Sequence, residues 1–180
     1  KPGFLQTKQL TKHFPLRGSD KVVQAVDKVT ISVAKGEAVG LVGESGSGKT
    51  TVGRCLMRLE HPTAGAVTLD GQDVTELSAT EMRRMRSRMQ IVFQDPFDSV
   101  NPRWTIANIL DEPLRVHEGG NKAARKQRAV DALKQVDLDP SMMMAKPRDL
   151  GASTLQRINI ARALICNPDF VVLDEPTSVL

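Results

Sequence analysis

Alternating apolar and polar residues at the start of the chain predict strands. Residues 4–10 alternate loosely, residues 11–15 (Thr-Lys-His-Phe-Pro) break the pattern, and residues 22–33 resume it with valine and isoleucine on one face. A glycine-containing turn at 35–37 follows. The two segments therefore predict a hairpin-like beginning of the fold.

Four shorter apolar runs predict the remaining strands. They occupy residues 38–42, 66–69, 89–93 and 170–173. The run at 170–173 contains no polar residue, which is typical of a strand in a parallel sheet that is covered on both faces.

Helical spacing of apolar residues accounts for much of the rest of the chain. Helices are expected at residues 51–59, 121–136 and 153–166, with a short one at 106–110 in a proline-rich passage. Residues 78–81 read Ser-Ala-Thr-Glu, a capping-box pattern that predicts another helix start.

The glycine-rich stretch after residues 38–42 fits the pattern G-x-x-x-x-G-K-[ST], which binds phosphate groups. Its glycines allow backbone N–H groups to turn inward, and the following helix adds its free N–H groups and its dipole. Lys49 is expected to reach the β- and γ-phosphates, and the Thr50 hydroxyl to bind Mg²⁺. The candidate nucleotide-binding residues are Gly43, Glu44, Ser45, Gly46, Ser47, Gly48, Lys49, Thr50 and Thr51.

Two adjacent carboxylates follow the apolar run at 170–173. In P-loop nucleoside triphosphatases a strand of this kind brings an acidic residue beside Mg²⁺. Asp174 is the candidate metal ligand, and Glu175 is the candidate base that orients and deprotonates the attacking water. Taken alone, the pair also fits a strand that ends in two exposed acids.

Composition narrows the classes of function. The 180 residues, 40% of them hydrophobic, suffice for one α/β domain. No apolar run approaches the ~20 residues of a membrane-spanning helix, the first residues show no secretory signal, and the two distant cysteines are expected to be reduced. The net charge of +4 is mild, and one tryptophan without any tyrosine disfavours stacking on single-stranded nucleic acid.

With these motifs the sequence resembles the nucleotide-binding domain of an ABC transporter over essentially its whole length. Residues 43–50 match Walker A, residues 173–178 match Walker B and its exit, and Gln94 matches the Q-loop glutamine. The resemblance implies ATP and Mg²⁺ as cofactors, a catalytic and metal-binding role for Gln94, and stacking of adenine on Phe14. As a bare residue, Phe14 fits a hydrophobic core equally well.

Within this family the sequence is most similar to ATPase subunits of bacterial dipeptide and oligopeptide importers. Residues 93–96, 99–103 and 111–114 carry this narrower resemblance. It implies ATP hydrolysis that drives import at the cytoplasmic face of the membrane. The implied partners are a second nucleotide-binding domain, membrane permease subunits and, indirectly, a solute-binding protein, with no nucleic acid.

The resemblance also implies the organisation of the fold. We expect an α/β protein with a RecA-like P-loop core and an antiparallel flank, formed by residues 1–94 and 168–180. A helical subdomain is expected at residues 95–167, and the chain is expected to be truncated at its C-terminus. Residues 95–114 are the expected docking face for a permease subunit, although Phe97, Trp104 and Ile106 also fit a packed interior.

One departure from the family concerns its Leu-Ser-Gly-Gly-Gln signature. Residues 150–154 read Leu-Gly-Ala-Ser-Thr, which removes a hydroxyl group and adds Cβ atoms where backbone should approach a phosphate. This change favours a regulatory module that binds ATP with little turnover, whereas Glu175 favours hydrolysis. An ABC-type ATPase of DNA repair or chromosome maintenance is a further alternative, but its long coiled coil or zinc motif is missing from the sequence.

Overall fold

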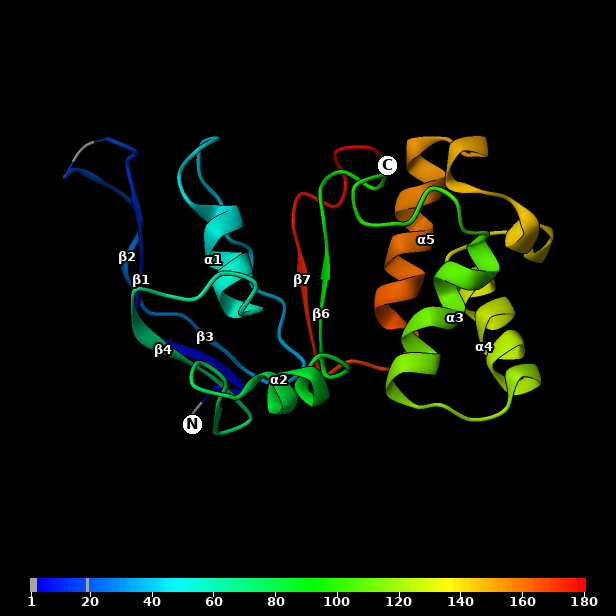
Figure 1. Ribbon diagram of the computed structural model, residues 1–180, viewed down its shortest axis with the longest axis horizontal. Coiled ribbons are helices and arrows are strands. Elements are labelled where there is room, and N and C mark those ends of the chain that lie inside the picture. Colours follow the sequence, from blue (N-terminus) through cyan, green and yellow to red (C-terminus); the bar gives the residue numbers. More distant parts are fainter. Residues whose placement is uncertain (1–2, 19) are drawn as a thin grey trace. The chain divides into compact units, whose positions relative to one another are not determined.

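The computed structural model describes residues 3–18 and 20–180, and it separates into two compact units (Figure 1). The first unit extends to Met82 and the second begins at Arg83. The helix α2 (Ala79–Met85) crosses this boundary. In the described part of the chain, no helix has the length and apolar character needed to cross a lipid bilayer.

An antiparallel sheet forms most of the first unit. The C-terminal half of β1 (Leu5–Pro15) pairs with β2 (Val22–Val29), which confirms the predicted hairpin. The N-terminal half of β1 pairs with β4 (Ala64–Leu69) and with β3 (Ser32–Val33). The short strand β5 (Gln72–Asp73) pairs with β4 at the edge of the sheet.

The predicted break after the first strand is wrong, because β1 continues to Pro15. Lys12 pairs with Val26, and Phe14 pairs with Val23. The register shifts on both sides of Lys12, so a bulge accommodates the segment that resembled a break.

Residues 38–42, predicted to form a strand, join no sheet in the described part of the first unit. They are exposed instead, and Val42 is 91% exposed. An apolar run becomes a strand only where neighbouring strands satisfy its backbone N–H and C=O groups. Among the described residues, no segment pairs with this run, so the pattern alone was not sufficient.

Two helices begin where local signals predict. The helix α1 (Lys49–Leu56) follows the glycine-rich loop and buries Val52 and Cys55. The helix α2 starts after the capping box: the Ser78 backbone N–H donates to Glu81 Oε2 at 2.8 Å, and the Glu81 N–H donates to Ser78 Oγ at 3.3 Å.

Two parallel strands run through the second unit. Residues of β6 (Met89–Val92) pair in order with those of β7 (Phe170–Leu173), so partners are separated by a constant offset along the chain. The parallel pairing confirms the prediction for residues 170–173, and the run at 89–93 forms the predicted strand. The predicted cover on both faces is incomplete, because Leu173 is 54% exposed.

A helical core forms the rest of the second unit. It contains α3 (Ile106–His117), α4 (Lys122–Gln135) and α5 (Ala152–Leu164), and the short helices η1 (Pro140–Met144) and η2 (Pro147–Asp149) connect α4 to α5. The largest fully buried side chains of this core are those of Ile106, Ile109, Leu110, Leu114, Leu133, Leu155 and Ile158.

The prediction of a short helix at 106–110 is wrong, because α3 continues to His117 with Pro113 inside it. Thr105 caps the helix by accepting a hydrogen bond from the Asn108 N–H at 3.3 Å. Proline in a helix interior costs about 3 kcal/mol or more. The buried apolar face of α3, which includes Leu114, offsets this cost. The expected division into residues 1–94 with 168–180 and residues 95–167 stays a prediction.

Candidate functional site

The glycine-rich loop ends at Gly48, which caps α1 in a left-handed conformation with φ of 95°. A Cβ atom at this position would lie 2.1 Å from the Ala25 carbonyl oxygen. Only glycine permits this close approach of the loop to β2. The loop and β2 are therefore in contact within the first unit.

Lys49 lies across the loop. Its Nζ donates to the carbonyl oxygens of Gly43 and Glu44, at 2.6 and 2.7 Å, and to Ser47 Oγ at 3.3 Å. These acceptors carry only partial negative charges, whereas a phosphate oxygen carries a larger charge and forms stronger hydrogen bonds with an ammonium group. The lysine can therefore exchange these contacts for contacts with a phosphate held by the same loop.

The remaining predicted residues of the loop present an accessible surface. Residues 43–47 and Thr50 are exposed, while Thr51 is half-buried at the first turn of α1. The free N–H groups and the dipole of this helix end favour a bound anion. The loop thus combines a cation, backbone donors and hydroxyl groups on one short segment.

Phe14 belongs to the same unit as the loop. It lies half-buried on β1, opposite Val23 of β2. Two residues further along β2 is Ala25, which Gly48 contacts. The pairing of β1 with β2 therefore brings Phe14 within two strand positions of the phosphate-binding loop.

The second unit holds the other predicted residues, at the carboxyl ends of its parallel strands. The Gln94 side-chain Nε2 donates to Glu175 Oε2 at 3.0 Å. The Asp174 N–H donates to the Val92 carbonyl oxygen at 2.9 Å, which continues the ladder between β6 and β7. The structure thus brings Gln94, Asp174 and Glu175 together, although Gln94 and Asp174 are 80 positions apart in the sequence.

The structure gathers the predicted residues into two groups, one in each unit. The first group contains the glycine-rich loop and Phe14, and the second contains Gln94, Asp174 and Glu175. Their union in one site stays a prediction. Among the described residues, no three side chains of histidine, cysteine, aspartate or glutamate cluster as a metal site.

The altered signature lies at the beginning of α5. Gly151 is the N-cap residue, with an ordinary φ of −73°, and Ala152 is the first helical residue. Gly151 forms no side-chain cap, whereas the serine of the family pattern carries a hydroxyl group at this position. Ser153 and Thr154 are half-buried in the first turn.

The candidate docking segment has both exposed and buried aromatic or aliphatic residues. Phe97 is 43% exposed, whereas Ile106 is completely buried in the helical core. Trp104 also packs against that core. The packed interior therefore holds for Trp104 and Ile106. Phe97 is the exposed residue of the three, and the docking face stays a prediction.

Two polar residues that the sequence analysis did not assign support the segment around Gln94. Gln156 and Asn159 lie on the buried side of α5. Their side-chain amides donate to the carbonyl oxygens of Phe93, at 3.1 Å, and Pro96, at 2.9 Å. Their spacing of three residues placed them on one helix face, but only the fold shows what that face contacts.

Comparison with known proteins gives a consistent result. Residues 26–178 match the family described as ABC transporter. A putative peptide import ATP-binding protein of Brucella ovis is 51% identical over 98% of this chain and 55% of its own length. The oligopeptide transport ATP-binding protein AppF of Bacillus subtilis is 42% identical over 98% of this chain and 56% of its own length.

Solved structures support the same fold. The ATP-binding cassette MJ0796, described in a dimeric post-hydrolysis state bound to ADP and Pi, superimposes with a TM-score of 0.90 at 30% identity. The match covers 98% of this chain and 75% of that one. The chain therefore has the P-loop nucleoside triphosphatase fold, and it spans about half the length of the curated relatives described above.

Proposed function

The chain belongs to the ABC transporter family, and from this premise we propose that it is part of an ATPase subunit that energises solute import. The observation that carries the proposal is the glycine-rich loop with Lys49 across it, because this arrangement provides a cation and several backbone donors for a triphosphate. The peptide import names of the relatives favour peptides or similar small solutes as the cargo.

In this proposal the residues of the loop hold the phosphates of ATP. Lys49 moves its ammonium group from the Gly43 and Glu44 carbonyl oxygens to the β- and γ-phosphates. Ser45, Gly46, Ser47 and Gly48 contribute backbone N–H groups, and Thr51 adds a hydroxyl group at the first turn of α1. Phe14 stacks on adenine, two strand positions from the loop.

The candidate metal ligands fit Mg²⁺ by their chemistry. Thr50, Gln94 and Asp174 offer hydroxyl, amide and carboxylate oxygens, which are the hard donors that Mg²⁺ prefers. When bound, Mg²⁺ would neutralise charge that develops on the phosphates. Asp174 would hold it directly or through water.

Glu175 is the proposed general base. Its carboxylate accepts the proton of the attacking water, and Gln94 helps to orient that water. The hydrogen bond of 3.0 Å between Gln94 and Glu175 favours this pairing of roles, because both side chains reach the same small region.

The proposed partners follow from the dimeric cassette and from the names of the relatives. A second nucleotide-binding domain completes the ATP site. Permease subunits at the cytoplasmic face of the membrane receive the motion that ATP hydrolysis drives, and a solute-binding protein delivers the cargo.

Gly151 favours a second candidate function, a regulatory module that binds ATP with little turnover, because this position lacks the hydroxyl group of the family signature.

Two substitutions in the full-length protein test this function. Glu175→Gln should retain ATP but hydrolyse it roughly 10²–10⁴-fold more slowly, since an amide cannot accept the proton. Lys49→Ala should lose the stabilisation by Mg-ATP, which is about 2.7 kcal/mol at 100 times the dissociation constant. Thermal-shift titration and single-turnover assays measure the two effects.

Glu76→Gln is the matched control, because Glu76 is an exposed acid outside the loop and the strand ends. It should behave as the wild type in both assays. Binding of ATP without measurable hydrolysis by the wild-type protein would instead support the regulatory module. Equal stabilisation of Lys49→Ala and wild type would remove the loop from the phosphate site.

A further inference from the structure

The side chain of Lys12 makes three contacts on the first unit. Its Nζ donates to the His61 carbonyl oxygen at 2.8 Å and forms an ion pair with Glu60 at 3.2 Å. The same atom lies over the ring of Phe14, 4.9 Å from the ring centroid. Since only 15% of the Lys12 side chain is exposed, this ammonium group is held in place rather than solvated freely.

These contacts connect two parts of the proposed nucleotide site. Glu60 and His61 follow α1, the helix that begins at the phosphate-binding loop. Phe14 lies on β1, which pairs with the strand that Gly48 contacts. Lys12 therefore joins the far end of the loop's helix to the ring that would receive the base.

Exposed apolar residues lie near Phe14 at the end of the β1–β2 hairpin. Leu16, Val22 and Val23, at the end of the β1–β2 hairpin, are each between 45% and 48% exposed. A nucleobase that stacks on Phe14 would cover part of this surface, and stacking on an aromatic ring requires only a flat π-face. The ring offers one face to the Lys12 ammonium, so a base would stack on the opposite face.

We propose that Lys12 is a positioning residue for the nucleobase: its ammonium group covers one face of Phe14 and holds the ring ready for a base on the other. The inference rests on the proposed function, because it assumes that ATP binds at the loop. A cation over an aromatic face is attracted by the ring quadrupole. A ring that is already ordered loses less conformational freedom when the base binds.

The base is the part of the ligand that Lys12 should affect, which separates this role from general structural support. The test uses the full-length protein with Mg²⁺ and compares ADP with inorganic pyrophosphate, which lacks the base. Lys12→Met should raise the dissociation constant of ADP by about 3- to 10-fold and leave that of pyrophosphate unchanged. Phe14→Ala should weaken ADP binding by about 10-fold or more and likewise spare pyrophosphate.

Two further variants serve as controls. Lys12→Arg retains a cation that can lie over the ring, so it should restore ADP binding close to the wild-type value. Lys8→Met removes the same charge from an exposed position of β1 and should change neither ligand. Thermal-shift titrations with each ligand give both dissociation constants and the stability of every variant.

The results have distinct consequences. If Lys12→Met weakens ADP and pyrophosphate equally, Lys12 supports the loop through α1 and the inference is wrong. If Lys12→Met changes neither ligand, the inference is wrong as well. If Lys49→Ala still binds both ligands as the wild type does, the phosphate site of the proposed function is wrong, so this failure is distinguishable from that of the Lys12 inference.

Discussion

At the scale of single residues, one backbone contact explains why position 48 is glycine. A side chain there would meet the Ala25 carbonyl oxygen at 2.1 Å, and the φ of 95° lies in the region that disfavours side chains. Gly36 has a similar φ of 77°, but a Cβ atom there would meet nothing within 4 Å. Both glycines have a left-handed backbone, but only Gly48 has a close steric contact. Comparing the two positions therefore distinguishes the cost of that contact from the cost of the backbone conformation.

We predict that Gly48→Ala impairs both stability and nucleotide binding, because the loop must move away from β2. Its cost should exceed the roughly 1 kcal/mol that alanine pays for a left-handed conformation alone. Gly36→Ala should show only that smaller cost and bind ATP normally. Chemical denaturation and ATP titration of the two variants measure this difference, and equal losses in both would contradict the steric explanation.

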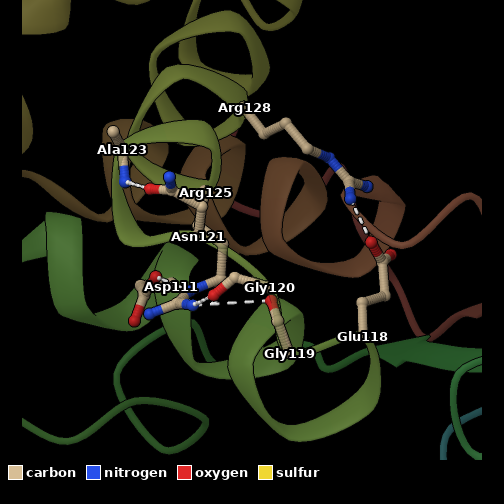
Figure 2. A network of polar contacts seen from close by, with 8 residues as sticks. All are labelled: Asp111, Glu118, Gly119, Gly120, Asn121, Ala123, Arg125 and Arg128. Carbon is tan, nitrogen blue, oxygen red and sulfur yellow. Dashed lines mark hydrogen bonds and ion pairs between the residues drawn. The ribbon is translucent and has the colours of Figure 1, made fainter.

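At the scale of elements, a polar network fixes the corner between α3 and α4 (Figure 2). Arg125 of α4 reaches back to α3 and to the connecting turn, and Arg128 reaches the end of α5. Such hydrogen bonds satisfy backbone carbonyl groups that helix ends leave unpaired. Arg125 contacts Asp111 at 2.7 Å and the Gly120 carbonyl oxygen at 2.5 Å. Arg128 contacts Glu118 and the Ile165 carbonyl oxygen. The Asn121 side chain accepts a hydrogen bond from the Ala123 N–H at 2.7 Å.

The same network sets the chemistry of Cys166. Burial, together with the negative charge of Glu118, raises the pKa of this thiol from an ordinary 9.0 to about 11, and the positive charge of Arg128 opposes this shift. The folded protein therefore favours the neutral thiol. Because the unfolded chain releases this proton first, the contribution of Cys166 to stability is complete below pH 9 and declines as pH rises toward 11.

We predict slow alkylation of Cys166 at pH 8, with a rate that rises only as pH approaches 11, because the thiolate is the reactive form. Glu118→Gln should move this profile to lower pH by removing a negative charge beside the sulfur. Peptide mass spectrometry after timed exposure to iodoacetamide measures the rate at this position. An unchanged profile in the variant would assign the shift to burial alone.

At the scale of the whole molecule, the second unit presents the candidate docking segment for a permease. Phe97 and Arg103 are exposed, whereas Trp104 and Ile106 belong to the helical core. The segment follows Gln94 directly, and Gln156 and Asn159 bind the carbonyl oxygens of Phe93 and Pro96, which lie on either side of Gln94. A shift of Gln94 would therefore move Phe97 before it moved the packed residues Trp104 and Ile106.

We predict that a cysteine at Arg103, introduced in the full-length protein without its native cysteines, forms crosslinks to the cytoplasmic loops of a cognate permease. A cysteine at Gln127, exposed on α4, is the matched control and should not react with the permease. Crosslinking in membranes that carry the assembled transporter provides the measurement. Crosslinks from Gln127 and none from Arg103, with transport still coupled to ATP hydrolysis, would place the docking face elsewhere.

Local sequence signals determined much of this protein. The spacing of Gly43, Gly48 and Lys49 identified the phosphate-binding loop, the capping box placed α2, and the helical repeat placed α4 and α5. These features depend on interactions between residues that are few positions apart, so the chain specifies them without a partner segment.

Tertiary structure decided the features that need distant segments. Pairing of β1 with β2 made the supposed break at Lys12 a bulge, and contacts with Glu60 and His61, distant in the sequence, hold its ammonium group. The parallel register of β6 and β7 placed Gln94 beside Glu175. The helical core kept Pro113 inside α3, and no strand among the described residues pairs with 38–42, so this run joins no sheet. Backbone pairing and burial involve partners far apart in the sequence, and these partners outweigh local propensity.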